Sequence, residues 1–459
     1  MGFTHQKESE VILVRGLAEE ATAPAAASCL GAQGFGPHSP IENSQIPRRL
    51  VFLLVRTCPD RVFTNPDMIR RDYLIVGAGA AGVAAADTIR SLDKKGSIML
   101  VSAEPHPGVR RPDLLPGILG SKPVPVEKLL VHDEAWFGRM KVDLRLNTFV
   151  TQFSLEQRAA VLATGQAVVF GKALLATGSR ARRPEVAGSN LGNVFYLRSA
   201  RDLLALREVT ELEKNVAVVG GGLVAAETAA LLRKLKVNVT LIARSQALWT
   251  RFFDHDTAAW FTKYVAANGV KLMLGEHLNG FEGRTMLQRV QTKSGQRIDT
   301  TMAVVALGSE PNLQLVQASP LWSQNGCPVT ERLESDELGI FAAGDIALYP
   351  NPILGGMRRE EHWDAALAMG HAAGYNMASK KMVNFSYIPW HRSRVFDLEF
   401  DFIGDFTRPP TRVELEGDRD KRRKFLLKCY QLNKLTGIIC CNAEEKKVKA
   451  LRADFAKLK

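Results

Sequence analysis

The stretch YLIVGAGAAGVAAADTIR, residues 73–90, places a short apolar run before a glycine-rich turn and an alanine-rich segment. This order predicts a buried strand, a tight turn and a helix. A second apolar strand is expected at 98–101, and Glu104 follows it about 20 residues beyond the last glycine, where such a unit carries an acid for a ribose hydroxyl. The pattern therefore predicts a dinucleotide site rather than merely a tight turn between strand and helix. The small residues that would meet its pyrophosphate are Gly77, Gly79, Ala81 and Gly82.

A comparable unit begins at residue 216 and has the same order of strand, glycine turn and helix. Its three small turn positions are Gly220, Gly222 and Ala225. The strand that follows, at 238–242, is not closed by an acid, because Ala243 and Arg244 stand there. An arginine at this place pairs with a 2′-phosphate, which favours NADPH. The alternative is an ordinary surface charge, so the choice between NADH and NADPH stays open.

The composition is that of a globular protein. The chain has 459 residues, of which 24% are charged and 46% hydrophobic, and this length suggests about three domains. No apolar run reaches the about 18 residues that a membrane-spanning helix needs. The net charge of +12 favours anionic partners or reflects a solvated basic surface. Six cysteines without a CxxC pair argue against a disulfide scaffold and a cysteine-bound zinc, and we expect no metal site.

Three further strand ends bring small or acidic residues to places where a cofactor could meet the backbone. They close the runs LLATG at 174–178, VVALG at 304–308 and GIFAAGD at 339–345. The positions concerned are Thr177, Gly178, Gly308 and Asp345.

The succession GAGAAG, ATG, GGGLVAAE, ALGSEPN and AAGDIA resembles the FAD- and NAD(P)H-dependent pyridine-nucleotide reductase family. Residues 101–115 and 358–377 are similar, more narrowly, to apoptosis-inducing factor and the related ferredoxin and rubredoxin reductases. Residues 389–397 continue that likeness, which covers about residues 68–445. The resemblance implies FAD and NAD(P)H as cofactors.

The resemblance also implies which residues contact FAD. Its pyrophosphate would lie on the first glycine turn and its adenine ribose on Glu104. Arg111 and Arg198 would contact the flavin cofactor, and Asp345 would hold the ribityl chain. Arg198 has a plainer alternative as a surface or helix-capping residue.

A second group of residues is implied at the flavin ring and the nicotinamide. His362 and Trp363 would lie beside the isoalloxazine, Glu361 and His362 would meet the nicotinamide nucleotide, and Phe396 would be the C-terminal aromatic that approaches the flavin. The catalytic candidates are Glu227 and His362, although His362 could also be a surface or capping residue.

Two departures from the family pattern bear on the chemistry. Pro116 stands where the family carries a lysine that bonds the glutamate of the second glycine motif, so Glu227 loses that partner. If Glu227 is buried, we expect its pKa to rise, because desolvation disfavours the carboxylate. Residues 104–133 contain no cysteine, which argues against thiol–disulfide exchange at the flavin. The electrons would then leave to a quinone, to oxygen or to a small iron–sulfur or haem protein.

The fold expected is α/β, with two Rossmann-like dinucleotide-binding domains and a C-terminal α+β domain. The NAD(P) domain is inserted into the FAD domain, because strands of the first unit flank the second one. The expected parts are a flexible extension at 1–67, an FAD-binding domain at 68–200 and 306–384, an NAD(P)-binding domain at 201–305, and a C-terminal interface domain at 385–459.

Two functions remain open at this point. The first is an FAD-dependent NAD(P)H oxidoreductase, and the second is a redox-sensing flavoprotein with slow turnover that acts through conformation or partner binding. The basic run at 421–424 is either a solvated loop or strand start or a nucleic-acid site. Family likeness indicates the mitochondrion, whereas acidic residues near the N-terminus favour the cytoplasm. The sequence leaves open whether the chain forms a homodimer.

Overall fold

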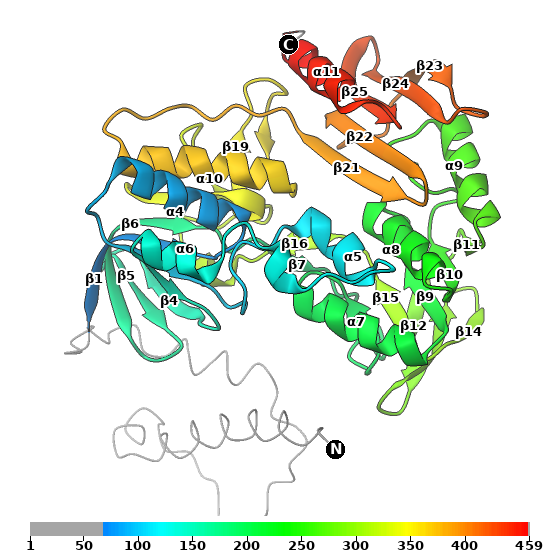
Figure 1. Ribbon diagram of the computed structural model, residues 1–459, viewed down its shortest axis with the longest axis horizontal. Helices are drawn as coiled ribbons and strands as arrows, with labels where there is room; N and C mark the ends of the chain where they lie inside the picture. The colour runs from blue at the N-terminus through cyan, green and yellow to red at the C-terminus, as the bar shows by residue number, and fades with distance from the viewer. Residues whose placement is uncertain (1–67, 458–459) are drawn as a thin grey trace, which may run out of the picture. The chain divides into compact units, whose positions relative to one another are not determined.

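The computed structural model describes residues 68–457, and the extension predicted at 1–67 lies outside them (Figure 1). These residues form two sheets built on parallel strands, followed by an antiparallel sheet with a terminal helix. The predicted fold class is therefore confirmed. Between residues 68 and 457, no helix has the length and apolar character needed to cross a membrane.

The first sheet is built around the strand that precedes the first glycine turn. β1 (Ile69–Val76) pairs in parallel with β2 (Ile98–Val101) and with β6 (Ala167–Leu175). The strand order is β3-β2-β1-β6-β5-β4, and β18 (Ile340–Ala342) joins in parallel beside β6. The other strands are β3 (Val142–Arg145), β4 (Val150–Ser154) and β5 (Ala159–Leu162). The chain thus returns to this sheet at β18 after building the second unit, as the order of the motifs predicts.

Two helices lie side by side on one face of the first sheet, α4 (Ala80–Leu92) and α10 (Trp363–Ala378) (Figure 1). Their backbones touch, because a Cβ on Gly370 would lie 2.2 Å from the carbonyl oxygen of Ala81, and one on Gly374 would lie 2.7 Å from that of Ala85. Only residues without a side chain permit this approach. The sequence predicts α4 as an alanine-rich helix, and the structure packs it against two glycines of α10, almost 300 residues later in the chain.

The second sheet has the order β11-β10-β9-β15-β8, and all its strand pairs are parallel. Its strands are β8 (Val194–Tyr196), β9 (Asn215–Val219), β10 (Asn238–Ala243), β11 (Lys271–Leu274) and β15 (Ala303–Val305). The helices of this part are α7 (Ala200–Leu212), α8 (Leu223–Lys234) and α9 (His255–Ala267). A small antiparallel sheet adjoins it in the chain, formed by β12 (Leu278–Gly283), β13 (Leu287–Thr292) and β14 (Arg297–Asp299). The domain limits expected from the sequence stay a prediction.

The two connections between the sheets run next to each other. β7 (Ser179–Ala181), where the chain leaves the first sheet, pairs antiparallel with β16 (Ser309–Pro311), where it returns. The second sheet is therefore entered and left at one place.

The C-terminal sheet is antiparallel, with the order β21-β22-β25-β24-β23. Its strands are β21 (Trp390–Val395), β22 (Leu398–Gly404), β23 (Arg412–Asp418), β24 (Lys424–Gln431) and β25 (Lys434–Cys441). Helix α11 (Glu445–Lys457) buries Val448 and Phe455 in one apolar cluster with Ile403 and Ile438 of this sheet. The remaining elements are α5 (Arg111–Leu119), α6 (Glu134–Arg139), the short 3-10 helices η1 (Val126–Leu129), η2 (Gln314–Val316) and η3 (Gly344–Ile346), and strands β17 (Cys327–Pro328), β19 (Ala347–Pro350) and β20 (Met357–Arg358).

The contact between α4 and α10 predicts a stability effect at Gly370. We expect Gly370→Ala to lower the free energy of unfolding by at least about 2 kcal/mol, because the new methyl group overlaps the Ala81 carbonyl oxygen. The matched control is Gly138→Ala in α6, where nothing lies within 4 Å of an added Cβ, and there alanine should be neutral or stabilising by up to about 1 kcal/mol. Urea unfolding followed by circular dichroism measures both variants. Equal stability of the two variants would contradict the backbone contact.

Candidate functional site

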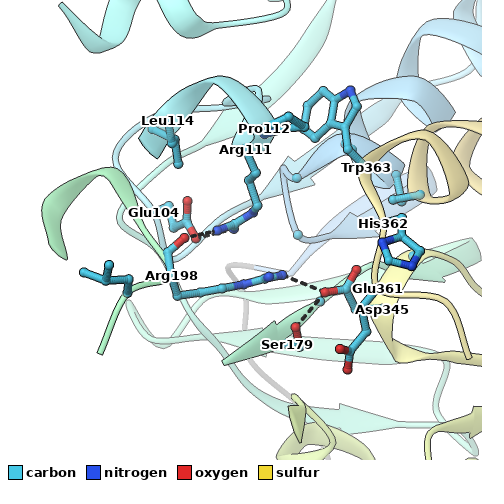
Figure 2. A pocket seen from close by; sticks show the side chains of 18 of the residues that line it. Glu104, Arg111, Pro112, Leu114, Ser179, Arg198, Asp345, Glu361, His362 and Trp363 are labelled. Atoms are coloured by element: carbon cyan, nitrogen blue, oxygen red, sulfur yellow. Dashed lines mark hydrogen bonds and ion pairs between the residues drawn. The ribbon is translucent and has the colours of Figure 1, made fainter. Parts of the chain in front are cut away.

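One continuous cavity of about 990 Å³ joins the two glycine units (Figure 2). Its walls come from the first glycine turn, the ends of β2 and β6, helices α5 and α8, the start of α10 and strand β21. Most of the residues singled out in the sequence line it, although they are spread over some 300 positions of the chain. The carboxyl ends of parallel strands are the ordinary place for such a site.

The first glycine turn leaves a helix N-terminus open to this cavity. Gly77 has a positive φ of 114°, and a Cβ there would lie 2.1 Å from the Ala176 carbonyl oxygen, so the turn requires glycine. Gly79 begins α4 without a side-chain cap, and nothing lies within 4 Å of an added Cβ. The first N–H groups of a helix lack partners within it and bind phosphate well. Gly82 has a packing role instead, because a Cβ there would overlap Gly77, while Ala81 is buried against α10.

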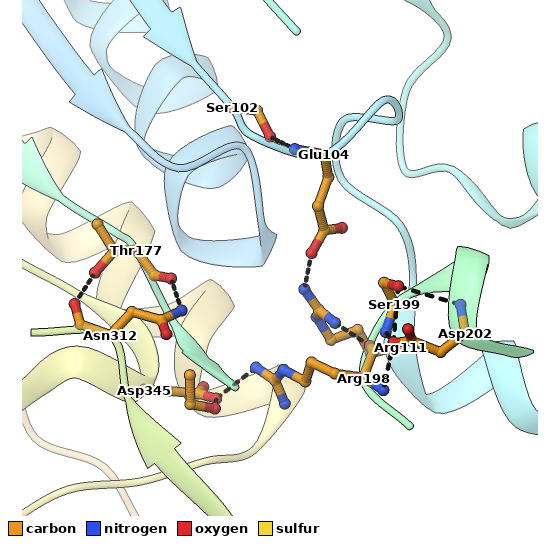
Figure 3. Close-up of polar contacts among 10 residues, drawn as sticks. Ser102, Glu104, Arg111, Thr177, Arg198, Ser199, Asp202, Asn312 and Asp345 are labelled. Carbon is orange, nitrogen blue, oxygen red and sulfur yellow. Dashed lines mark hydrogen bonds and ion pairs between the residues drawn. The ribbon is translucent and has the colours of Figure 1, made fainter. Parts of the chain in front are cut away.

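Glu104 is held by an arginine of α5. Its Oε1 accepts a hydrogen bond from Nη2 of Arg111 at 2.8 Å, and its backbone N–H donates to Ser102 Oγ (Figure 3). Arg111 also donates to the backbone oxygen of Arg198. The other carboxylate oxygen of Glu104 has no hydrogen-bond partner among residues 68–457, so an acceptor remains for a ribose hydroxyl.

Asp345 lies at the centre of a second polar cluster. Its Oδ2 accepts from Ser179 Oγ at 2.6 Å and from Arg198 Nη2 at 2.7 Å (Figures 2 and 3). Burial lowers the pKa of Arg198, and the negative charge of Asp345 opposes that shift. The buried Nε of Arg198 has no partner among the described residues, so the guanidinium has a donor left for a ligand. Ser179 was missed by the sequence analysis, although it directly follows the predicted Gly178.

The two connections between the sheets are tied together beside this cluster. Thr177 Oγ1 donates to the backbone oxygen of Asn312 at 2.9 Å, and Asn312 Nδ2 donates back to the Thr177 oxygen at 2.8 Å (Figure 3). Thr177, Gly178 and Asn312 line the cavity. Gly308, also expected at a cofactor, is not among the lining residues, and its carbonyl accepts from the Arg182 N–H.

The start of α10 contributes a stack of flat rings. The ring of His362, the N-cap residue, lies 4.2 Å from the ring of His391 at an angle of 7°, and His391 stacks in turn on Phe402 at 4.6 Å. Burial lowers the pKa of both histidines, so both imidazoles are neutral near pH 7. Trp363 and Glu361 line the cavity beside them. The sequence analysis noted His391 in a motif but gave it no role.

The second glycine turn repeats the open helix start. Gly222 begins α8 without a side-chain cap and with open space around an added Cβ, whereas Gly220 lies against the Ala306 backbone and Ala225 is fully buried. Arg244 is exposed directly after β10 and has no partner among the described residues. Gly220, Gly222, Ala225 and Arg244 do not line the cavity. The face of α8 that begins at Leu223 does line it.

Glu227 lies on that face of α8 and lines the cavity together with Pro116. Glu227 has no lysine partner, as Pro116 predicts, and instead accepts from Ser393 Oγ at 2.5 Å and from the Arg394 N–H at 3.2 Å. Burial raises the pKa of Glu227 to about 7, and the Ser393 hydroxyl limits the rise, so the predicted upward shift is confirmed. Sequence could not find Ser393, because it is brought to α8 by the C-terminal sheet.

Phe396 forms the turn between β21 and β22 with a positive φ of 58°. Its ring lines the cavity and meets Tyr264 of α9 edge-on at 6.0 Å, and its carbonyl accepts from Lys234 Nζ. The residue predicted to approach the flavin therefore also joins the C-terminal sheet to α8 and α9.

No cysteine of residues 68–457 lines the cavity. Burial raises the pKa of Cys327, Cys429 and Cys440 to about 12, which keeps these thiols protonated. Cys440 and Cys441 pack in different apolar clusters on opposite faces of β25, as expected for a strand. The described cysteines are therefore packing residues and not redox groups.

Comparison with known protein families matches residues 71–370 to the pyridine nucleotide-disulphide oxidoreductases. The chain belongs to this family. It is 32% identical over 354 residues to the peroxisomal monodehydroascorbate reductase 4 of Arabidopsis thaliana, covering 73% of this chain and 72% of that one. It is 30% identical over 354 residues to the ferredoxin–NAD(+) reductase component of the biphenyl dioxygenase system of Paraburkholderia xenovorans (strain LB400), covering 77% and 85%.

A solved structure of a ferredoxin reductase has a similar fold. The ferredoxin reductase for the CYP199A2 system from Rhodopseudomonas palustris superposes with a TM-score of 0.77 and 26% identity, covering 84% of this chain and 95% of that one. This pyridine nucleotide-disulphide oxidoreductase is thus an FAD-dependent NAD(P)H oxidoreductase. The narrower likeness to apoptosis-inducing factor stays a prediction.

The cavity residues fit both cofactors of the family. Bound FAD supplies an acceptor for the hydride of NAD(P)H. Gly79 and Gly222 leave two helix starts free for pyrophosphates, and Arg198 has an unpaired donor toward the cavity. The neutral rings of His362 and His391 add no charge beside Asp345. The first glycine turn and the face of α8 that follows the second turn thus meet in one cavity, where two nucleotides would be oriented for hydride transfer.

The two open glycines predict separable losses of nucleotide binding. Gly79→Ala should weaken FAD binding at least about tenfold, and Gly222→Ala should weaken NAD(P)H binding by a similar factor, because each methyl group occupies free space beside a helix start. Neither change strains the fold, since both glycines have ordinary negative φ angles of −75° and −90°. FAD content and nucleotide titration of the purified variants measure the effects, and each variant is the control for the other. Loss of both ligands in either variant would contradict the assignment.

Proposed function

We propose that the protein oxidises NAD(P)H through FAD and passes the electrons one at a time to a small ferredoxin-type protein. The observation that carries the proposal is the cavity, which extends from the first glycine turn to helix α8 of the second unit and is lined by no cysteine from residues 68–457. A disulfide relay therefore has no thiol to use there, and the electrons must reach an external acceptor. The bacterial relatives named as ferredoxin–NAD(+) reductases support an acceptor of this type.

The overall charge of the protein supports an acidic partner. The chain carries a net charge of +12. A net positive charge attracts an anionic carrier and speeds its docking.

Within this proposal, the sequence-derived residues keep their roles in binding FAD and the nicotinamide nucleotide. The FAD set is Gly77, Gly79, Ala81, Gly82, Glu104, Arg111, Thr177, Gly178, Arg198, Gly308 and Asp345. The nucleotide and flavin-ring set is Gly220, Gly222, Ala225, Arg244, Glu361, His362, Trp363 and Phe396, with Glu227 and His362 as the catalytic candidates. Gly82 and Gly308 of the FAD set do not line the cavity, and the same holds for Gly220, Gly222, Ala225 and Arg244 of the second set.

A second candidate function is a redox sensor with slow turnover. It is favoured by Pro116, which offers no charge to the cavity, and by the bonds of Glu227 to β21, which couple the nucleotide-binding helix to the C-terminal sheet. Rapid multiple turnover would rule it out.

The structure and the relatives also bear on nucleic-acid binding and on the location of the protein in the cell. In the basic run at 421–424, Arg423 pairs with Asp397 and Lys424 with Glu444 at the start of β24, which favours a solvated strand start over a nucleic-acid site. The mitochondrial location finds no support in the relatives reported above, one of which is named as peroxisomal, and the cytoplasm remains the alternative. The homodimer stays a prediction.

The acceptor is tested by steady-state turnover. With NADPH or NADH as donor, a [2Fe–2S] ferredoxin coupled to cytochrome c should be reduced rapidly, and the rate should fall as ionic strength rises, because salt screens the net positive charge of the protein. Glutathione disulfide and a quinone are the comparison acceptors. Faster reduction of the disulfide or the quinone than of ferredoxin would overturn the proposal.

Arg244 predicts the choice of nucleotide. Arg244→Ala should slow flavin reduction by subsaturating NADPH about tenfold and leave reduction by NADH close to wild type, because the lost guanidinium pairs only with a 2′-phosphate. The matched control is Arg284→Ala, another exposed and unpaired arginine between β12 and β13. Anaerobic stopped-flow absorbance measures the four combinations. Equal effects of Arg244→Ala on both nucleotides would exclude this role.

A further inference from the structure

Glu227 lies in the middle of the α8 face that lines the cavity, between Leu223 at the open helix start and Lys234 at the other end. Its carboxylate is bound by two donors from β21, the Ser393 hydroxyl and the Arg394 N–H. Ser393 is buried and Pro116, across the cavity wall on α5, offers no charge. The carboxylate is therefore fixed in place by neutral groups and has no direct ion pair.

Oxidation of NAD(P)H by one-electron acceptors leaves a proton behind, and a carboxylate in the cavity can accept it. NAD(P)H gives up a hydride, which is two electrons and one proton, when the C4–H bond of the dihydronicotinamide breaks. Two molecules of a ferredoxin-type acceptor each take one electron and no proton. One proton for each NAD(P)H oxidised therefore stays in the cavity until a base takes it to solvent.

We propose that Glu227 is the base that takes this proton, and that Ser393 is the positioning residue that holds its carboxylate toward the cavity. The electrons leave through bound FAD to the acceptor, the proton forms an O–H bond on Glu227, and the protonated carboxyl then releases it to water beside the mostly exposed Arg394. This inference rests on the one-electron acceptor proposed above. A hydride acceptor would leave no proton behind.

The surroundings of Glu227 suit a group that gains and loses a proton near neutral pH. The charged or titratable side chains on the elements packed against α8 are Arg111 and Asp113 of α5 and His391, Arg392 and Arg394 of β21. Three of these arginines are already paired: Arg111 with Glu104, Arg392 with Asp401 and Arg394 with Glu399. His391 is neutral, since burial lowers its pKa, and α8 itself adds Arg233 and Lys234. Because burial raises the pKa of Glu227 to about 7, both forms are populated under ordinary conditions.

The test separates single-electron removal from hydride removal in the FAD-loaded protein. Ferricyanide takes single electrons and no proton, whereas the oxidised 3-acetylpyridine analogue of the nicotinamide nucleotide takes a hydride. In Glu227→Gln, the ratio of the ferricyanide rate to the transhydrogenation rate should fall at least about tenfold, because the amide cannot accept the proton. In the wild type this ratio should rise with pH through about 7, since only the carboxylate accepts a proton.

A second measurement does not depend on turnover. The visible absorbance of the oxidised FAD-loaded protein should titrate with a midpoint near pH 7, and Glu227→Gln should abolish that titration. Ser393→Ala removes a donor to the carboxylate, so the midpoint and the pH profile should both move upward by about one unit. The matched control is Ser97→Ala, since Ser97 also gives its hydroxyl and its N–H to a carboxylate, that of Asp72, but lies outside the cavity.

The outcomes separate this inference from the proposed acceptor. A normal rate ratio in Glu227→Gln, or an unshifted titration in Ser393→Ala with full FAD content, would overturn the role of Glu227. Slow reduction of ferredoxin together with the expected ferricyanide and titration results would overturn the proposed acceptor and leave the role of Glu227 in single-electron removal supported.

Discussion

Backbone-to-backbone contact between α4 and α10 is the constraint on which the site depends. With no side chain at Gly370 or Gly374, the two helices lie as close as their main chains allow. Their N-termini, at Gly79 and His362, then reach the same cavity from two distant parts of the sequence. Any residue that widened this contact would move the start of one helix relative to the other and change the shape of the cavity that both helices line.

Two ion pairs lie in this cavity, and in each pair one polar atom has no hydrogen-bond partner among the described residues. Arg198 binds Asp345 and keeps a buried donor free, and Glu104 binds Arg111 and keeps an acceptor free. A buried polar atom without a partner is costly, so the free Nε of Arg198 in the cavity wall indicates that a ligand completes its hydrogen bonds. Glu227 differs from these groups, because its neutral partners leave its charge variable.

Local patterns in the sequence were sufficient for the parallel sheets and both glycine turns. The strand at 98–101 and the helix after Gly79 are signalled by residues that are neighbours in the chain, and the structure places them as predicted. The sequence also identified Asp345 and Glu227, but not their partners, because Ser179 and Ser393 each stand 166 residues from the carboxylate they bind. Such pairs depend on how whole sheets pack together, and the local periodicity of the sequence does not predict that packing. Gly308 was also expected at a cofactor, but it does not line the cavity, and its positive φ of 95° gives the turn its own reason for a glycine.

Because β7 and β16 pair with each other, the segment between them can be exchanged during evolution. The intervening 127 residues between Arg182 and Gly308 begin and end at neighbouring positions of one two-stranded ribbon. A segment with adjacent ends can be lost, replaced or recombined as a module while the host sheet keeps its geometry. Gly222 and Arg244 lie within this exchangeable segment, whereas the first sheet is held by contacts outside it.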